Sequence, residues 1–150
     1  VAAGGALVAD LYASPLTVVA AATGHAVAAG ALVLLGCDHR VGVDGPVKIG
    51  LNEVAIGMVL PPWALIIARD RLSKRYFHSS TTNARLFDGR TAVDAGFLDE
   101  VVAAESVVER ALEKATELSA LVPAAYARTV EVVRGPVIAE MRAVDPRSIL

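Results

Sequence analysis

The sequence predicts an α/β fold, and three patterns indicate it. An apolar segment with strand composition, residues 16–22, is followed by a segment with helix composition, residues 31–36. Short strand-like segments recur in the middle of the chain, and the last third shows helical periodicity with helix boundary signals. Strands that alternate with helices are typical of parallel sheets covered by helices.

The first 50 residues are predicted to alternate between helix and strand. A helix over residues 6–12 ends before Ser14-Pro15, because proline disfavours helical backbone in the residue before it. Residues 16–22 are apolar apart from Thr17, which is the pattern of a strand buried on both faces. The remaining predicted elements of this half are a small-residue turn over 24–30, a buried helix over 31–36, and strands over 40–43 and 47–49 around a turn at 44–46.

Helices dominate the prediction beyond residue 60. Pro61-Pro62 opens a helix that runs to Leu72, because proline suits the first helical turn. Ser106 and Glu109 have the spacing of a capping box at the start of another helix. The apolar face of that helix is predicted to hold Val108, Ala111, Leu112, Ala115 and Leu118. The other predicted elements are an interrupted helix over 74–87, a short helix over 91–95, a strand over 97–102, and helices over 123–134 and 137–144, separated by Gly135-Pro136.

Composition narrows the function classes. The chain has 150 residues, is 55% hydrophobic and 20% charged, and carries a formal net charge of −2. One domain is expected at this length, and the apolar content excludes a disordered chain. Without a basic excess, neither nucleic acid nor an anionic membrane is an expected partner. The single cysteine, Cys37, excludes a disulfide framework and a multi-cysteine metal site, and it fits a reducing compartment.

The hydrophobic excess needs its own explanation, and residues 16–37 are long enough for a membrane span. Threonine and glycine interrupt that stretch, and no positive cluster flanks it, so a strand followed by a buried helix is favoured and no membrane is expected. No secretory signal is recognised. A chain that begins with Val1 rather than Met is expected to be processed or incomplete, so part of the apolar surface would be covered by a larger subunit.

Several kinds of catalytic site are excluded. His25, His39 and His78 lack metal-ligand spacing, so no metal is predicted. The chain contains neither a nucleophile elbow nor a P-loop. Cys37 lies in an apolar run and is predicted to be a buried, inert thiol.

Two segments carry candidate chemistry. Residues 24–30 join a strand to a helix with small residues, so free amides at the helix start can donate to an oxygen that gains negative charge. Tight packing of helix on sheet would explain the same composition. Glu53 is a lone carboxylate before an apolar run, where burial would raise its pKa and make it a better base. An exposed turn residue or a satisfied helix cap is the simpler alternative for Glu53.

Taken together, these segments resemble the enoyl-CoA hydratase/isomerase (crotonase) superfamily in order and spacing. The resemblance rests on residues 23–31 (TGHAVAAGA), 37–40 (CDHR), 49–58 (IGLNEVAIGM) and 87–102 (FDGRTAVDAGFLDEVV). It implies a crotonase-like (ClpP/crotonase) spiral of ββα units with C-terminal trimerisation helices. Residues 1–102 would form the C-terminal portion of the spiral core and residues 103–150 the C-terminal helical region, with the N-terminal part apparently missing.

The resemblance also assigns candidate roles. Ala29 is similar in position to a family residue whose backbone amide helps form the oxyanion hole, and the other amide would come from an upstream segment that is absent here. Hydratases of the family use two glutamates, one at the position of Glu53 and one at the position of Leu32. Only Glu53 is present, which resembles the Δ3-Δ2-enoyl-CoA isomerases of the superfamily, and an apolar Leu32 would keep water from the site.

The implied function is isomerisation of a 3-enoyl-CoA to a 2-enoyl-CoA by proton transfer through Glu53. The coenzyme A thioester would be the substrate, no cofactor would be covalently bound, and a homotrimer or hexamer is expected. Hydration, another crotonase-type acyl-CoA reaction, or a catalytically silent acyl-CoA-binding protein remain alternatives. Predicted substrate-binding residues are Ala28, Gly30, Leu32, Met58 and Trp63. Leu60 and Ile66 follow Glu53 on the same apolar segment as Met58 and Trp63, and these four residues either line the acyl pocket or pack in the core.

Localisation is weakly constrained. The C-terminal Ser148-Ile149-Leu150 lacks the basic middle residue of a peroxisomal signal. A cytoplasmic bacterial protein is expected, and the preference for arginine over lysine is a compositional hint of the bacterial origin.

Overall fold

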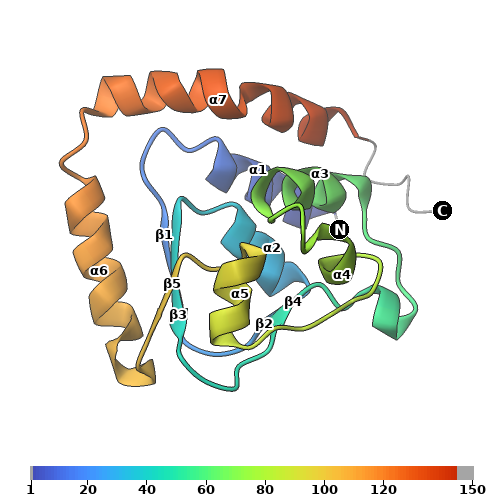
Figure 1. The fold of residues 1–150 in the computed structure, drawn as a ribbon. Coiled ribbons are helices and arrows are strands. Elements are labelled where there is room, and N and C mark those ends of the chain that lie inside the picture. The colour runs from blue at the N-terminus through green and yellow to red at the C-terminus, as the bar shows by residue number, and fades with distance from the viewer. Residues whose placement is uncertain (1, 145–150) are drawn as a thin grey trace.

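The computed structural model describes residues 2–144, which form helices packed around two small parallel sheets (Figure 1). In chain order the elements are α1 (Ala2–Tyr12), β1 (Val19–Ala22), β2 (Ala26–Val27), α2 (Ala29–Leu35), β3 (His39–Val43), β4 (Ile49–Gly50), the 3₁₀ turn η1 (Val54–Ile56), α3 (Pro62–Arg71), α4 (Phe77–Ser80), α5 (Gly89–Ala95), β5 (Glu100–Val102), the 3₁₀ turn η2 (Ala104–Ser106), α6 (Val107–Leu118) and α7 (Pro123–Ala143).

Both sheets are parallel, as an α/β fold requires. The larger sheet has the order β1-β3-β5, with Val19 opposite His39 and Val41 opposite Glu100. The smaller sheet pairs β2 with β4, with Ala26 opposite Ile49. The second pairing places the start of α2 beside the segment that follows β4, because parallel strands end at the same edge of a sheet.

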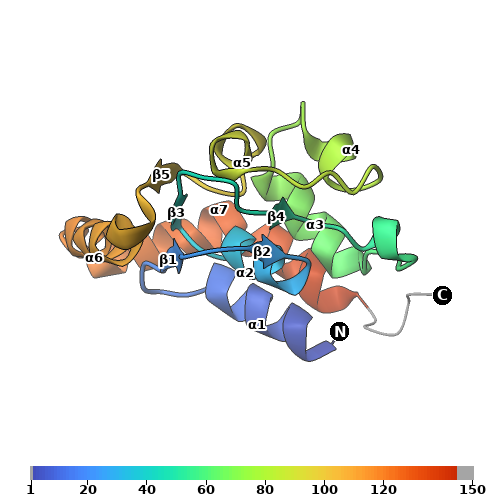
Figure 2. The same ribbon diagram turned by 90° about the horizontal axis from the view of Figure 1, so that it is seen from below.

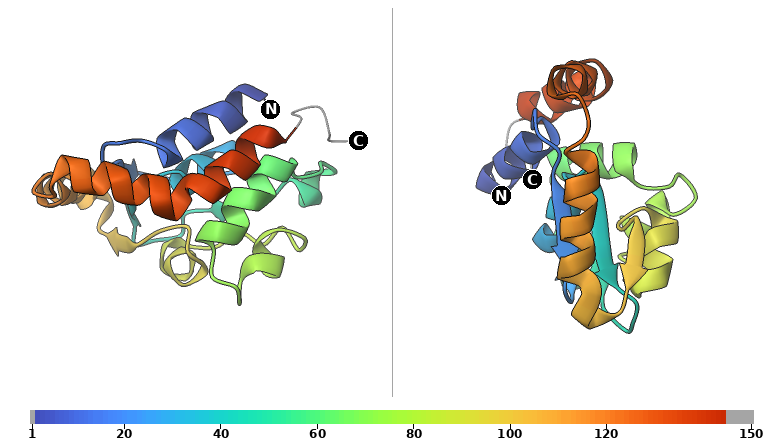
Figure 3. Two further views of the ribbon diagram at one scale, coloured as in Figure 1. Left: turned by 90° about the horizontal axis from the view of Figure 1, so that it is seen from above. Right: turned by 90° about the vertical axis from the view of Figure 1, so that its left-hand side faces the viewer.

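The helices form two groups (Figures 2 and 3). Helix α6 lies against β1 and β3, where Val107 and Ala111 are buried in a small cluster with Val41 and Val43. Helices α1, α2, α3 and α7 pack on one another, and α7 runs along both α1 and α3 (Figure 3). The main hydrophobic core lies among these helices and α5, around fully buried side chains such as Leu35, Ile67 and Phe97.

Several predicted elements are confirmed with shifted ends. The predicted helix over 6–12 begins four residues earlier and ends at Tyr12 as expected. The predicted helix over 74–87 is reduced to the short α4. The predicted strand over 16–22 begins only at Val19, and its residues are half-buried or exposed rather than buried on both faces. The strand is only partly buried because β1 lies at the edge of the three-stranded sheet formed by the described residues.

The predicted capping box at Ser106 is wrong. Residues 104–106 already form the 3₁₀ turn η2, so Ser106 has helical backbone angles (φ −98°, ψ −6°) and makes no side-chain cap hydrogen bond. An N-cap residue needs extended backbone for its side chain to reach the third amide. Asp88 meets that condition (φ −76°, ψ 177°), accepts from the Thr91 amide at 2.8 Å and so caps α5.

The predicted break at Gly135-Pro136 is also wrong, because α7 is continuous with Pro136 inside it. A proline in a helix leaves the carbonyl four residues earlier without a donor. Here that carbonyl belongs to Val132, and both Val132 and Pro136 are exposed, so water can replace the missing donor. Burial of Val130, Ile138 and Met141 on either side of the proline holds both halves of the helix on the core.

The apolar face predicted for α6 is buried only in part. Val107 and Ala111 are buried, whereas Val108 and Leu112 are 52% and 65% exposed. Within residues 2–144 no helix has both the length and the apolar character to cross a membrane, and residues 16–37 contain two strands and a helix. The division into regions 1–102 and 103–150 stays a prediction, and residues 145–150 lie outside the described part of the chain.

Candidate active site

Glu53 lies directly after β4, at the start of η1. Its carbonyl oxygen accepts from the amides of Ile56 (3.1 Å) and Met58 (2.9 Å), which closes a tight turn. Gly57 completes that turn with φ +79°, in the left-handed region that glycine adopts without steric cost. The backbone hydrogen bonds therefore fix the position from which the Glu53 side chain extends.

The carboxyl group of Glu53 is buried without a charge partner. The residue is only 6% exposed, and its Oε2 is enclosed with no hydrogen-bond partner among the described residues. Burial raises the pKa of the Glu53 carboxyl above its ordinary value, and the residue's own backbone amide offsets part of that rise. A carboxylate in this state takes up and releases a proton more readily near neutral pH than an exposed glutamate does.

The start of α2 is the second half of the site. Ala28 donates its amide to the Gly50 carbonyl at 2.9 Å, and its own carbonyl accepts the first helical bond, from Leu32 at 3.1 Å. The Ala29 amide comes before that bond, so no carbonyl within the helix can accept it. Ala28 adopts φ 54° and ψ −118°, a strained conformation for a residue with a side chain. The strained turn directs the chain from β2 into α2.

Gly50 allows the two halves to meet. Its φ is +147°, and an added Cβ would lie 2.9 Å from the Arg85 carbonyl oxygen, so a side chain has no room there. With glycine at this position, β4 can pair with β2 and still be contacted by the segment near Arg85. The turn that carries Glu53 thus begins beside the start of α2.

Glu53 and the start of α2 share one apolar cavity of about 580 Å³. Its lining consists of Gly4, Leu7, Val8, Ala28, Ala29, Leu32, Val33, Glu53, Ile56, Gly57, Met58, Val59, Pro61 and Trp63. Among the described residues Glu53 is the one titratable side chain on this lining. The structure therefore brings together the predicted site residues Glu53, Ala28, Ala29, Leu32, Met58 and Trp63.

Three of the candidate residues do not line this cavity. Gly30 is exposed and lies outside it, because α2 begins at Ala29 and its cavity-facing side carries residues three and four positions later, Leu32 and Val33. Leu60 and Ile66 are buried in the main core and do not line the cavity.

The sequence did not indicate the wall contributed by α1. Gly4, Leu7 and Val8 lie more than 40 residues before Glu53, and nothing in their local pattern points to a site. The one unusual feature there is the pair Gly4-Gly5 inside a helix, where glycine is unfavourable unless a neighbour needs the space.

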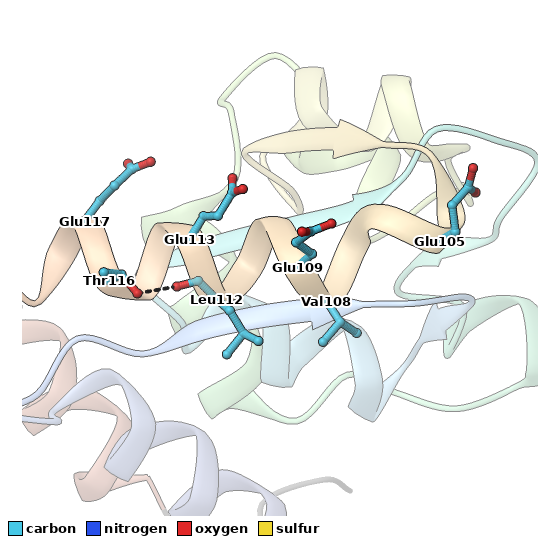
Figure 4. Close-up of a pocket in the computed structure, with 7 residues that line it drawn as sticks. All are labelled: Glu105, Val108, Glu109, Leu112, Glu113, Thr116 and Glu117. Carbon is cyan, nitrogen blue, oxygen red and sulfur yellow. Dashed lines mark hydrogen bonds between the residues drawn. The ribbon is translucent and has the colours of Figure 1, made fainter.

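A second, open groove of about 930 Å³ runs along α6 (Figure 4). It is lined by Glu105, Val108, Glu109, Leu112, Glu113, Thr116 and Glu117, and the Thr116 hydroxyl donates to the Leu112 carbonyl at 2.9 Å. Glu117 accepts from Lys114 and Arg110 at 2.9 and 3.0 Å, and these hydrogen bonds lower its pKa. An ionised, paired glutamate is a poor proton carrier, so Glu117 differs from the buried Glu53 in the property that proton transfer needs.

The cysteine and two of the histidines considered as reactive groups are buried or engaged in contacts within the fold. Cys37 is buried as predicted, and burial raises the pKa of its thiol. The ring of His25 accepts from the Lys48 amide at 2.8 Å, and His39 contacts Glu100 at 2.8 Å. Within residues 2–144, no group of three or more histidine, cysteine, aspartate or glutamate side chains is arranged to hold a metal ion.

Comparison with known proteins agrees with this geometry. The profile of the enoyl-CoA hydratase/isomerase family matches residues 3–143. Mitochondrial enoyl-CoA delta isomerase 1 of Homo sapiens is 34% identical over 112 residues, which cover 74% of this chain and 37% of the human protein.

Solved structures extend the comparison to the fold. An enoyl-CoA hydratase/isomerase family protein from Pseudomonas syringae is 40% identical with a TM-score of 0.95, covering 98% of this chain and 65% of that protein. The human mitochondrial delta3-delta2-enoyl-CoA isomerase is 30% identical with a TM-score of 0.88, covering 93% of this chain and 55% of the human chain. The fold is therefore crotonase-like, and the chain spans about 37% of the curated human relative it matches.

Proposed function

Because the chain belongs to the enoyl-CoA hydratase/isomerase family, we propose that it isomerises a 3-enoyl-CoA to a 2-enoyl-CoA. The observation that carries this proposal is Glu53, a buried and unpaired carboxyl group on an otherwise apolar cavity. The human sequence and the human structure that resemble this chain both carry the name of a delta isomerase. The coenzyme A thioester is the proposed substrate, and the proposed chemistry needs no bound cofactor.

In the proposed mechanism Glu53 accepts a proton from C2 of the 3-enoyl-CoA. The electron pair of that C–H bond delocalises into the thioester carbonyl, whose oxygen becomes negatively charged. In this proposal the Ala29 amide donates to this oxygen, and a second amide donor is expected from outside these 150 residues. The protonated Glu53 then returns the proton to C4, while the double bond moves to C2–C3 and the carbonyl re-forms. The proton count balances without a second acid or base.

Leu32 favours isomerisation over hydration. It is 3% exposed and lines the cavity where the family's hydratases carry a second glutamate. A leucine there provides no group to position water, and it makes the space around Glu53 less polar.

The test is Glu53→Gln in the complete protein, assayed for isomerisation of 3-hexenoyl-CoA. Removal of the proton carrier should lower kcat by about 10²–10⁴-fold. Glu140→Gln makes the same chemical change on the exposed side of α7 and should leave kcat unchanged. Undiminished turnover in Glu53→Gln would remove Glu53 from the mechanism.

Activity and binding measurements on the same protein distinguish the proposed isomerase from a hydratase and from a silent acyl-CoA-binding protein. Leu32→Glu restores the second carboxyl group, so a gain in hydration of a 2-enoyl-CoA would support the role assigned to Leu32. Hydratase activity in the unmodified protein would favour the hydratase alternative. Acyl-CoA affinity without turnover of any enoyl-CoA would favour a silent binding protein.

We also propose that the exposed apolar side chains of α6, Val108 and Leu112, are covered in a homotrimer or hexamer. Exposed apolar patches of this kind mark interaction surfaces. Leu112→Lys should reduce the mass of the assembly measured by sedimentation equilibrium. Glu109→Lys, which replaces one polar side chain of the same helix by another, should reduce that mass less. A cytoplasmic location stays a prediction.

A further inference from the structure

We propose that Trp63 is the wall that limits the length of the acyl chain, because it separates the cavity of Glu53 from a second, smaller cavity. This inference rests on the proposed function and specifies which acyl groups the site accepts. The smaller cavity has a volume of about 170 Å³ and is lined by Gly5, Ala6, Ala9, Trp63, Met141, Arg142 and Val144. Trp63 is the one described residue that lines both cavities.

The position of the indole ring is set by two adjacent glycines of α1. Gly4 lines the larger cavity and Gly5 the smaller one, so the boundary between the two cavities passes between neighbouring residues. A Cβ at Gly5 would lie 3.1 Å from Cδ1, Cδ2 and Cε2 of Trp63, which places Gly5 against the face of the five-membered ring. At Gly4 the nearest ring atom, Cζ2, would be 3.9 Å away, an ordinary contact. The absence of a side chain at Gly5 makes the room that the indole occupies.

The two helices that form this wall are tied together. The Tyr12 hydroxyl at the end of α1 donates to Asp70 of α3, the helix that carries Trp63. From α7, Arg134 donates to the Tyr12 carbonyl at 3.2 Å and stacks on its ring at 4.7 Å. Arg142 adds an ion pair to Asp10 at 2.9 Å. These contacts tie α1 to α3 and α7 around Trp63, which is 7% exposed.

A wall of this kind has a consequence for the substrate. An acyl chain with its thioester at Ala29 and its reacting carbons at Glu53 extends through the apolar part of the cavity and ends at the indole. The space behind the indole is mostly apolar, so removal of the ring would let additional methylenes enter it. Each methylene transferred from water into such a space contributes about 0.8 kcal/mol to binding, or roughly fourfold in affinity.

The experiment measures the binding of saturated acyl-CoAs, which carry no double bond and report affinity without turnover. Hexanoyl-, decanoyl- and tetradecanoyl-CoA are titrated calorimetrically into the complete protein and its variants. Trp63→Leu opens the wall, so the affinity for tetradecanoyl-CoA relative to hexanoyl-CoA should rise about tenfold or more. Gly5→Ala pushes the ring into the larger cavity, so the same ratio should fall below that of the unmodified protein.

Controls keep the test decisive. Gly135→Ala also adds a methyl group to a helical glycine, but its Cβ meets nothing within 4 Å, so the ratio should not change. If Trp63→Leu does not fold, Gly5→Ala and Trp63→Phe test the inference in its place. The affinity for tetradecanoyl-CoA relative to hexanoyl-CoA should rise less in Trp63→Phe than is expected for Trp63→Leu. Trp63 is the single tryptophan of the 150-residue sequence, and its emission, isolated by subtraction of Trp63→Phe, should change with decanoyl-CoA and not with free coenzyme A.

The outcomes separate this inference from the proposed function. If the unmodified protein binds acyl-CoAs and the chain-length ratio is the same in Trp63→Leu and Gly5→Ala, Trp63 is not the wall, and the proposed function stands. If the unmodified protein binds none of the three acyl-CoAs, the proposed function fails and the wall assignment fails with it.

Discussion

Arg40 and Glu53 are the two buried charged residues among those the structure describes, and their surroundings are opposite. Arg40 is 4% exposed and fully engaged, with Nε and Nη2 on the two oxygens of Asp99 at 2.7 and 2.9 Å and Nη1 on the Gly96 carbonyl at 2.8 Å. Glu53 is 6% exposed, and its Oε2 has no partner. One buried charge holds strands and helices together, and the other remains free to exchange a proton.

The pKa shifts follow from this difference. Burial raises the pKa of both Asp99 and Glu53, but at Asp99 the hydrogen bonds and charge of Arg40 outweigh burial and hold the pKa below its ordinary value. Within residues 2–144, no cation acts on Glu53 in this way. The partner, rather than burial alone, therefore decides whether the pKa of a buried carboxyl group lies above or below its ordinary value.

The largest expected effect comes from breaking the paired site. Arg40→Met removes the donors of Asp99 and Gly96, so the free energy of unfolding should fall by about 3 kcal/mol. Urea denaturation measures the loss. Arg90→Met is the matched control, because Arg90 also pairs with an aspartate, Asp44, but its side chain is 77% exposed, and its removal should change stability little. Equal losses in the two variants would contradict the structural role of Arg40.

The second prediction gives Glu53 the partner that it lacks. Met58 lines the same cavity, is 52% exposed and donates its amide to the Glu53 carbonyl, so the amine of Met58→Lys can approach the carboxyl group. A nearby cation should lower the pKa of Glu53 by about one unit or more. The acidic limb of the kcat/KM profile should then move to lower pH, with a lower plateau because the base is weaker. Met58→Gln should leave the limb in place, and an unmoved limb in Met58→Lys would argue against Glu53 as the titrating base.

A smaller effect is expected from the strained backbone on the cavity side. Ala28→Gly should raise the free energy of unfolding by about 1 kcal/mol, because release of strain at φ 54° exceeds the added flexibility of glycine in the unfolded chain. Ala139→Gly, in an exposed part of α7, makes the same change at a helical position and should lower stability by roughly 0.5–1 kcal/mol. Thermal unfolding of both variants tests the sign, and a loss in Ala28→Gly would mean that the conformation is not strained.

The smallest effect is a pH dependence with opposite signs at the two sites. The raised pKa of Glu53 means that its contribution to stability is complete below the ordinary value of 4.5 and is lost as pH rises through the raised value. The lowered pKa of Asp99 means that its contribution is present above the ordinary value of 3.8 and is lost as pH falls through the lowered value. When the pH is raised from about 4 to about 7, the free energy of unfolding of Glu53→Gln should therefore increase relative to that of the unmodified protein. Urea unfolding at both pH values measures this, and a constant difference between the two proteins would contradict the raised pKa.

The sequence predicted most of the elements because their signals are local. Pro15 marks the end of the first helix, the proline pair at 61–62 marks the start of α3, and apolar runs mark the strands. Glu53 and residues 28–29 could also be identified, because a carboxylate before an apolar run and a small-residue turn before a helix are visible in short windows of sequence.

Local signals misled where distant residues compete with them. Gly135-Pro136 ends an isolated helix, but burial on both sides of the proline keeps α7 intact. Ser106 has the right spacing for a cap, but a preceding 3₁₀ turn gives it the wrong backbone angles, and Asp88 caps α5 instead. In each case the deciding contact or geometry lies outside the window in which the signal is read.

By itself, the sequence determined the α/β class, the order of the elements, the family resemblance and the residues proposed to carry the chemistry. Only the tertiary structure decided that Glu53 is unpaired while Arg40 is satisfied, that α1 forms one wall of the cavity, and that Trp63 stands between two cavities. The physical reason is that pairing, burial and cavity shape depend on residues brought together from α1, α2, β4, α3 and α7, which no local pattern encodes.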